Sequence, residues 1–384
     1  MSSQLKVNAI SDAAGANGNA ITLATDGTCT AKVTNRSSNL IINGACNVAQ
    51  RSSSPVTDDG YQTVDRFRLG YSGSDNHLTQ AQHALTSSDT GPWEKGFRYS
   101  YHITNGNQTS GAGAGDKAEI RYQVEAQDMA NSGWNYTSAS SYITFSFWVK
   151  SSVAQNFYGY ILTLDGTGQN YPFETGSLSA NTWTKITKKI PGNSNLQFDN
   201  DNAEGFRILI QPFMGTASTG SVSLNAWAAL VSDTRTPNQT STWWTTDDAT
   251  FEITGVQLEV GDVATDFEHR SYGDELQRCL RYCQRYQGGN GARVAIGVIG
   301  DSTTGYASFP TKVPMRATPS ISVTEAGKIV KEGTAWYDLT SLTIGTCTND
   351  VAVLTCVVSG GHSMSALDPF TMGDYTDFTL NAEL

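Results

Sequence analysis

Charge is scarce in this chain. Of its 384 residues, 16% are Asp, Glu, Lys or Arg, and the net charge is −11. An acidic chain repels phosphate backbones, so we expect it to bind neither DNA nor RNA. Adsorption to anionic lipid is disfavoured for the same reason. Disordered chains are usually highly charged and poor in aromatic residues, so the low charge of this chain indicates a folded protein.

Long apolar runs are also missing. The chain has no stretch of about 18 consecutive apolar residues, the length that a membrane-spanning helix needs. Residues 1–9 are polar and contain one lysine, so they lack the apolar core of a secretory signal. We therefore expect a product made in the cytosol without membrane insertion, which leaves a cell by lysis or by another route that needs no signal.

Cysteines are few. Six in a chain of this length are too sparse for a disulfide framework. Cys279 and Cys283 are four residues apart, which is not the C-x-x-C spacing, and no histidine lies nearby at the spacing of a zinc ligand. We interpret both as small apolar residues on a packed helix face.

Aromatic and turn-forming residues, in contrast, are plentiful. The chain has 8 Trp, 16 Tyr, 14 Phe and 37 Gly, a composition typical of all-β proteins with many turns. Between residues 38 and 268, short alternating segments recur. In 142–150, apolar residues at 143, 145, 147 and 149 alternate with Thr144, Ser146 and Trp148, the period of a half-buried strand. The repetition of such segments predicts a jelly-roll or similar β-sandwich.

One helix interrupts the β pattern. Ser271 with Asp274 resembles a capping box, and Gly288–Gly289 is a stop signal, so a helix is predicted over 272–286. Its apolar stripe has helical spacing. The stripe contains Leu276, Cys279, Leu280 and Cys283. Two interpretations stay open: the stripe forms the contact between three copies of the chain, or it packs on its own chain.

The sequence therefore predicts an all-β protein in which one helix joins a jelly-roll β-sandwich to a smaller C-terminal β domain. The segments are an extended N-terminal anchor (1–37), the sandwich (38–268), the connecting helix (269–288) and the C-terminal domain (289–384). The anchor is too poor in apolar residues to form a core, although 20–24 and 29–33 resemble short strands. It must pack on another part of the chain, on sister chains or on a larger particle.

Motifs of known enzymes are missing. None of the five histidines lies in H-E-x-x-H or another recognised metal spacing. Residues 361–365 resemble G-x-S-x-G only loosely, because the last glycine is absent. Carboxylate pairs that hydrolyse glycosidic bonds exist in principle among 36 acidic residues, but the sequence singles out none. We therefore expect a protein that is not an enzyme and has no catalytic residue.

Asp199 and Asp201 are candidates for a metal site. They belong to a run of oxygen-bearing side chains, 199–202, which is able to hold a structural Ca²⁺. A plain Asx turn explains the same residues without a metal. No other cofactor is expected.

Aromatic pairs in polar, loop-like surroundings are candidates for glycan binding. Aromatic faces stack on sugar rings, which are apolar on one side. The candidates are Trp134 with Tyr136, Trp243 with Trp244, and Trp336 with Tyr337. The alternative is that these rings cap the sandwich core or fill a subunit interface.

Several segments resemble bacteriophage tail-fibre and virion structural proteins. These segments are 39–44, 49–51, 63–67, 255–261, 267–273 with the helix that carries Arg278, Tyr282 and Tyr286, 309–310, 314–319 and 382–384. Residues 4–8 with 20–23 resemble the leaders of small fibre-like proteins in phages of marine bacteria. Residues 143–152 with 181–183 are similar to the jelly-roll of carbohydrate-binding modules. The resemblance extends over nearly the whole chain.

The resemblance implies a place on the virion, assembly into a homotrimer and a role near host recognition. It implies no catalytic residue. We expect other virion proteins to hold the N-terminal anchor, and bacterial surface polysaccharide to be the ligand of a tail fibre that mediates host attachment. The alternatives are a capsid-decorating or tail-assembly protein without glycan affinity and, as a lesser one, a glycan depolymerase.

Overall fold

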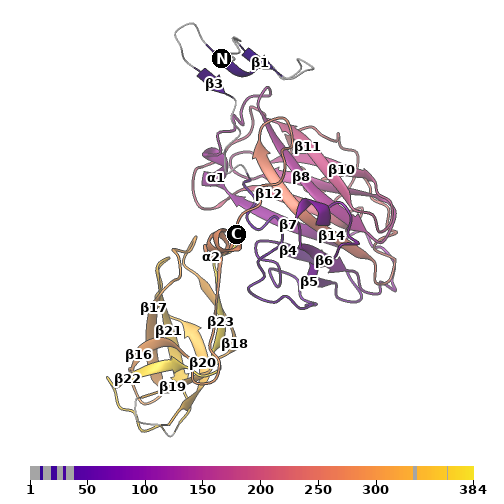
Figure 1. The fold of residues 1–384 in the computed structure, drawn as a ribbon. Coiled ribbons are helices and arrows are strands. Elements are labelled where there is room, and N and C mark those ends of the chain that lie inside the picture. Colours follow the sequence, from indigo (N-terminus) through magenta and orange to yellow (C-terminus); the bar gives the residue numbers. More distant parts are fainter. Residues whose placement is uncertain (1–8, 12–18, 24–28, 32–38, 332–334, 361) are drawn as a thin grey trace. The chain divides into compact units, whose positions relative to one another are not determined.

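The structure is a computed structural model that describes residues 9–11, 19–23, 29–31, 39–331, 335–360 and 362–384. The chain divides into two units, Met1–Ser38 and Asn39–Leu384. In the first unit, β1 (Ala9–Ser11), β2 (Asn19–Leu23) and β3 (Cys29–Ala31) form an antiparallel sheet (Figure 1). The strands expected over 20–24 and 29–33 are thus present as β2 and β3. Most of the expected particle anchor lies outside the described residues.

The second unit contains a sandwich of two antiparallel sheets. Its strands are β4 (Arg68–Ser72), β5 (Thr79–Ala84), β6 (Tyr99–Thr104), β7 (Lys117–Glu125), β8 (Tyr142–Ser151), β9 (Asn156–Thr163), β10 (Gln169–Ser177), β11 (Thr184–Pro191), β12 (Glu204–Met214), β13 (Ala228–Ala229) and β14 (Thr250–Val260). One sheet has the order β13-β10-β9-β12-β7-β4 and the other the order β11-β8-β14-β6-β5 (Figure 1). Two short helical turns, η1 (Trp93–Lys95) and α1 (Ala126–Ala130), lie between strands. The predicted all-β sandwich is confirmed.

The alternation along β8 explains how the two sheets pack. Phe145 and Phe147 are buried between the sheets, and Phe145 meets Phe173 from β10 edge to face, with ring centroids 5.8 Å apart. Burying each such ring stabilises the fold by roughly 2 kcal/mol. Trp148 and Lys150 alternate with the core residues and therefore stand on the outer side of the five-stranded sheet.

The connecting helix is shorter than predicted. The structure has α2 over Tyr272–Leu280, and Ser271 Oγ accepts a hydrogen bond from the Asp274 amide, so the expected start is confirmed. The helix ends before the expected Tyr286, because Cys283–Gln287 forms strand β15 and pairs with β23 (Asp377–Asn381). Helical spacing of apolar residues continues past Leu280, so the sequence did not reveal a pairing with a strand so distant in the chain.

The apolar stripe of α2 packs on its own chain. Cys279, Leu280 and Cys283 are buried within the described chain, and Leu276 is part-exposed. A side chain without exposed surface cannot contact a sister chain. The expectation that these three residues form a trimer interface is therefore wrong, and the alternative of packing within the chain accounts for them.

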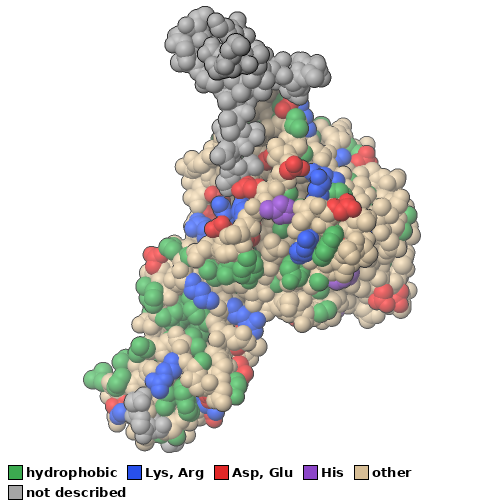
Figure 2. All heavy atoms as spheres, viewed as in Figure 1, with side chains coloured by type: hydrophobic (Ala, Val, Ile, Leu, Met, Phe, Trp, Pro, Cys, Tyr) green, Lys and Arg blue, Asp and Glu red, His purple; other side chains and the backbone are tan. Residues whose placement is uncertain are grey.

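A closed barrel follows the helix, as the smaller C-terminal β domain predicted from the sequence. Its strands are β16 (Arg293–Ile299), β17 (Thr304–Pro310), β19 (Lys328–Val330), β20 (Tyr337–Ile344), β21 (Val351–Val358) and β22 (Pro369–Gly373). Beside it, β15, β23 and β18 (Ser320–Glu325) form a three-stranded sheet. Hydrophobic side chains are visible on the barrel surface in Figure 2. The exposed hydrophobic residues of β16 and β17 include Ile296, Val298 and Tyr306.

The last residues of the chain connect the barrel to the sandwich. The carboxylate of Glu383 is buried, and it accepts hydrogen bonds from Arg66 and Arg51. The Arg66 guanidinium lies 3.5 Å from the ring centroid of Tyr282, just after α2. The main-chain oxygen of Glu383 accepts from Arg316 Nη2 at 3.0 Å. This buried network holds both domains of the second unit together.

Candidate functional site

Three of the predicted glycan-binding aromatics are core residues. Trp243 and Trp244 have no exposed surface, and Trp134 is buried as well. The indole of Trp243 donates to the Thr250 carbonyl at 3.0 Å, and the Trp244 ring stacks on Phe213 with centroids 5.3 Å apart. Their polar neighbours in sequence suggested an exposed loop, but the loop folds its rings into the end of the sandwich. The expectation that these tryptophans bind a glycan is therefore wrong.

The other three aromatics keep some exposed surface. Tyr136 packs edge to face on Phe198, with centroids 4.7 Å apart. Trp336 and Tyr337 lie at the start of β20 on the barrel, where the Tyr337 hydroxyl shares a 3.0 Å hydrogen bond with Ser363 Oγ. These residues stay candidates for ligand contact.

Asp199 and Asp201 form a turn. Asp201 Oδ1 accepts from the amide of Ala203 at 2.9 Å, and Asp199 Oδ1 accepts from Gln197 Nε2 at 2.6 Å. Asn200 between them has a left-handed φ of 56°, a conformation that Asn adopts readily. The Asx-turn explanation fits these bonds. Among the described residues, the two aspartates do not join a group of three metal-ligating side chains.

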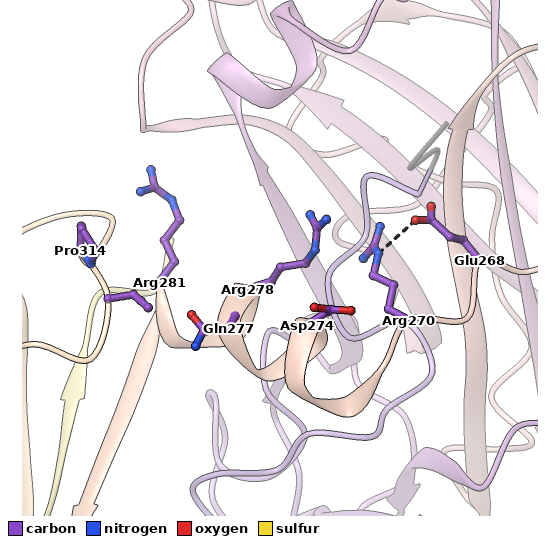
Figure 3. A pocket seen from close by; sticks show the side chains of 8 residues that line it. Glu268, Arg270, Asp274, Gln277, Arg278, Arg281 and Pro314 are labelled. Carbon is purple, nitrogen blue, oxygen red and sulfur yellow. Dashed lines mark hydrogen bonds and ion pairs between the residues drawn. The ribbon is translucent and has the colours of Figure 1, made fainter. Parts of the chain in front are cut away.

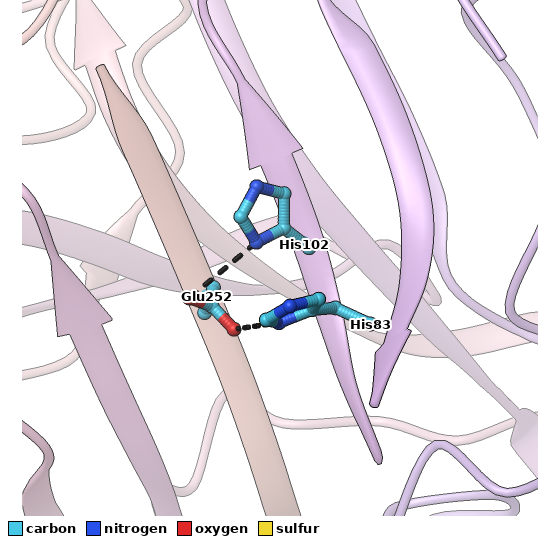
Figure 4. A group of neighbouring side chains, drawn as sticks. All are labelled: His83, His102 and Glu252. Carbon is cyan, nitrogen blue, oxygen red and sulfur yellow. Dashed lines mark hydrogen bonds and ion pairs between the residues drawn. The ribbon is translucent and has the colours of Figure 1, made fainter. Parts of the chain in front are cut away.

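A cluster of charged side chains stands instead on the outer side of the five-stranded sheet (Figure 4). Glu252 on β14 is directly opposite His102 on β6 and Lys150 on β8 in the strand register. His83 reaches the same carboxylate from β5. Glu252 Oε2 lies 3.1 Å from His83 Nδ1, and Oε1 lies 3.4 Å from His102 Nδ1 and 3.0 Å from Lys150 Nζ. Four neighbouring strands thus direct their polar groups at one buried carboxylate.

The electrostatics of this cluster keep its carboxylates ionised. Burial alone would raise the pKa of Glu252, but the two imidazoles and Lys150 hold it far below its ordinary range. Asp89 also accepts a hydrogen bond from Lys150, at 2.9 Å. Burial alone would raise the pKa of Asp89, but its hydrogen bonds outweigh burial and lower this pKa to about 2. A glycosidase needs a carboxylic acid with a raised pKa as its proton donor. Neither carboxylate is suited to that role.

Tryptophans border the charged cluster. Trp183 Nε1 donates to Asp89 Oδ1 at 3.0 Å, and Lys150 Nζ lies 4.8 Å from the Trp183 ring centroid. Trp148 on β8 and Trp93 on η1 are part-exposed and pack in the same small apolar group as Trp183. We call this surface the tryptophan face: Trp93, Trp148, Trp183, Asp89, Lys150, His83, His102 and Glu252.

A glycine lets the loop above β8 approach one of these rings. Gly91 has a φ of 95°, and a Cβ atom added there would lie 2.8 Å from Cζ3 of Trp148. A larger residue would be strained in its backbone and would clash with the ring. The loop at Gly91 therefore packs against the Trp148 ring and limits how much of that ring is exposed.

The sequence contained a signal for part of this face. The alternation over 142–150 already assigned Trp148 to the polar, outward side of its strand. Its neighbours His83, His102 and Glu252 are far apart in the chain, and only the pairing of β5, β6 and β14 brings them together. No local spacing encodes that register.

A cavity of about 650 Å³ lies elsewhere, along α2 (Figure 3). It is lined by Glu268, Arg270, Asp274, Gln277, Arg278, Arg281, Val313 and Pro314. Arg281 is held by both oxygens of Glu125, at 2.8 and 2.7 Å, and Arg270 by the carbonyls of Asn39 and Ile41. Because these guanidinium groups already stabilise the fold, we place the candidate site on the tryptophan face.

Comparison with known proteins does not assign a family. No family model matches the chain, and no curated protein matches it. A solved structure titled as the enzymatically active domain of tailspike protein 4 from bacteriophage CBA120 matches 58% of this chain and 21% of that chain, at 12% identity and a TM-score of 0.30. The match thus covers only a small part of the tailspike chain.

Two further solved structures are matched over nearly their full length. A carbohydrate-binding module of family 4 matches 57% of this chain and 98% of its own, at 13% identity and a TM-score of 0.29. A putative sugar-binding protein from Bacteroides thetaiotaomicron matches 58% of this chain and 100% of its own, at 13% identity and a TM-score of 0.31. At such scores, the likenesses assign neither a family nor a function.

Proposed function

We propose that this protein is a fibre protein of a bacteriophage particle and attaches the particle to host cells by binding a surface glycan on the tryptophan face. Two arguments support the proposal. The sequence motifs resemble those of phage fibre and virion proteins over nearly the whole chain. The sandwich also presents part-exposed indole rings next to charged hydrogen-bonding groups.

The observation that carries the glycan assignment is that the part-exposed Trp93 and Trp148 pack with Trp183, whose ring centroid lies 4.8 Å from Lys150 Nζ. Lys150 and His83 in turn contact the same carboxylate of Glu252. A sugar ring has an apolar side that stacks on an indole and a rim of hydroxyl groups that need hydrogen-bond partners. Part-exposed tryptophans beside an ammonium and an imidazole meet both needs. The surface is suited to shallow contacts with a polysaccharide chain.

Shallow contacts fit a multivalent protein. Assembly into a homotrimer, with the N-terminal anchor held by other virion proteins, is part of the proposal and rests on the resemblance. Several weak sites on one particle raise the overall affinity by orders of magnitude without any new contact. Light scattering on the full chain tests this assembly, and a stable monomer at micromolar concentration would contradict it.

Two alternatives remain as outcomes of the test. A glycan depolymerase is disfavoured on this face, because the pKa values of Asp89 and Glu252 are both lowered. A virion component without glycan affinity would have the same fold and no binding. Fluorescently labelled full-length protein is therefore added to a panel of bacterial cells, with periodate-treated cells alongside. Binding that periodate abolishes supports the proposal, and a folded protein that binds no cell in the panel favours the purely structural role.

A further inference from the structure

We propose that His83, His102 and Glu252 form a binding site for a divalent transition metal ion of the zinc class. Among the described residues, these three place one ligand atom each within 4.8 Å of the others. The proposal does not depend on the proposed glycan binding, since it rests on the geometry of these side chains alone (Figure 4).

The distances from each imidazole to the carboxylate are close to those between ligand atoms of a zinc site. His83 Nδ1 lies 3.1 Å from Oε2 of Glu252, and His102 Nδ1 lies 3.4 Å from Oε1 of the same carboxylate. In a tetrahedral site with metal–ligand bonds of 2.0–2.1 Å, neighbouring ligand atoms are about 3.3 Å apart. One ligand atom from each of the three residues lies within 4.8 Å of the others, so the side chains would draw together around a bound ion. Two imidazoles and one carboxylate suit zinc, whereas calcium prefers a shell of oxygens.

The surroundings of the ligands hold them in position. Ser100 Oγ donates to Glu252 Oε2 at 2.7 Å, and His102 Nε2 forms a 3.0 Å hydrogen bond with Thr104 Oγ1. That bond leaves His102 Nδ1 buried and directed toward the carboxylate, 3.4 Å from Oε1 but without a well-aligned hydrogen bond. Outer-shell bonds of this kind fix the orientation of metal-ligating residues. A bound cation would give this nitrogen a closer partner.

The site opens to solvent on one side. The His83 side chain is 48% exposed, whereas Glu252 is 3% exposed. The carboxylate thus forms the floor of the site and His83 its rim. A metal ion with three protein ligands keeps a fourth position for water or another small ligand, as open zinc sites do. That position would face the solvent next to His83.

Lys150 is a neighbour that opposes a metal ion. Its ammonium lies 3.0 Å from Glu252 Oε1, so it competes with a cation for the same carboxylate. Lys150 also bonds Asp89, at 2.9 Å, and keeps that partner when Glu252 binds a metal. The geometry therefore predicts opposite effects for two kinds of variant. Loss of a histidine weakens metal binding, and loss of the Lys150 charge strengthens it.

Metal binding is measured on the full chain without an affinity tag, after dialysis against a chelator. Zinc chloride is titrated by calorimetry, and bound zinc is counted by elemental analysis after gel filtration. One equivalent is expected. His83→Ala and His102→Ala should each weaken binding by roughly 100-fold or more, because even outer-shell partners contribute about 10–100-fold. His77→Ala is the matched control, since His77 is exposed and lies outside the cluster.

Lys150→Met keeps an unbranched side chain of similar length and removes its charge, and tighter zinc binding is expected. The visible spectrum of the cobalt-loaded protein should show low-coordinate nitrogen and oxygen ligation that His83→Ala abolishes. Circular dichroism confirms that each variant is folded. If His102→Ala does not fold, His83→Ala decides the question, because His83 is half-exposed and its loss should leave the fold intact. The proposal is overturned by the absence of saturable zinc binding, or by one-to-one binding that His83→Ala leaves unchanged.

Discussion

Glu252 and Lys150 lie directly opposite each other on β14 and β8, with Oε1 and Nζ 3.0 Å apart on the outer side of the sandwich. Burial alone would lower the pKa of Lys150, but the nearby carboxylate raises it above its ordinary value. The pair therefore stays charged. A charge pair at the middle of a sheet fixes the positions of the groups around it, and here those groups include His83 and Trp183.

Lys150→Met should destabilise the protein by about 1–3 kcal/mol, because it leaves the nearly buried Glu252 with fewer partners. Lys189→Met is the matched control, since Lys189 on β11 forms an exposed pair with Asp262, which follows β14. That control should change stability by less than about 0.5 kcal/mol. Urea denaturation of both variants compares the two values. Equal effects would mean that the buried pair contributes no more than a surface pair.

Trp93→Ala should weaken glycan binding by about 3- to 10-fold per site, since one aromatic contact is worth roughly 0.5–1.5 kcal/mol. Trp93 belongs to a short loop turn and forms part of no strand, so the variant should stay folded. Trp336→Ala on the barrel serves as the comparison. Cell binding by each variant is measured at equal concentration. A loss confined to Trp336→Ala would move the glycan site from the tryptophan face to the barrel.

The sequence predicted the positions of helices and strands better than it predicted which segments pack or pair with one another. Alternation placed Phe145 in the core and Trp148 outside, and Ser271 marked the start of α2, because each signal lies within a few residues. The end of α2 and the burial of Trp243 depend on segments distant in the chain. The polarity of neighbouring residues in sequence predicts exposure poorly where a loop folds back over a sandwich.

The candidate site shows the same limit. His83, His102 and Glu252 meet only because β5, β6 and β14 pair in one register, and a shift of one residue would send each side chain to the opposite side of the sheet. Nothing in their spacing along the chain carries that information. The aromatic pairs chosen from the sequence were one or two residues apart, whereas the part-exposed Trp93 and Trp148 are single residues brought together by folding.

Trp244→Ala should destabilise the sandwich by roughly 3–5 kcal/mol, the usual cost of removing a large buried aromatic side chain. The ring is fully buried and stacked on Phe213. Thermal and urea denaturation measure the loss, with Trp336→Ala as a part-exposed tryptophan for comparison. A fully stable Trp244→Ala that has lost only glycan binding would restore this residue to the candidate site.

The free energy of unfolding should decrease in acid, because Glu125 becomes protonated. Burial alone would raise the pKa of this carboxyl, but hydrogen bonds from Arg281 and Tyr282 outweigh burial and leave the pKa below its ordinary 4.5. A lowered pKa in the folded state contributes stability above pH 4.5, and this contribution is lost as the pH falls through the folded-state value.

Urea denaturation above and below pH 4.5 measures this contribution. Arg281→Met removes the bidentate pair with Glu125, and so the variant should lose stability mainly at neutral pH. The difference between wild type and variant should shrink as the solution becomes acidic. A difference that stays constant across this range would show that Arg281 acts through packing and that its charge is not involved.

Glu383→Ala should loosen the barrel from the sandwich. The carboxylate bonds Arg66 and Arg51, and Arg66 is almost fully buried, so the variant leaves a buried cation without its main partner. Removing one member of a buried ion pair typically costs about 3–5 kcal/mol. Limited proteolysis should then cut the chain near β15, the strand that follows α2, before either domain unfolds.

Glu325→Ala is the control for the tail variant, because Glu325 is exposed at the end of β18. It should leave both the cleavage rate and the unfolding transition unchanged. If Glu383→Ala is cut no faster than this control, other contacts between the domains, such as the pair of Arg281 with Glu125, hold them together without the ion pairs of Glu383. Faster cutting of Glu383→Ala alone shows that the ion pairs of Glu383 with Arg66 and Arg51 hold the barrel to the sandwich.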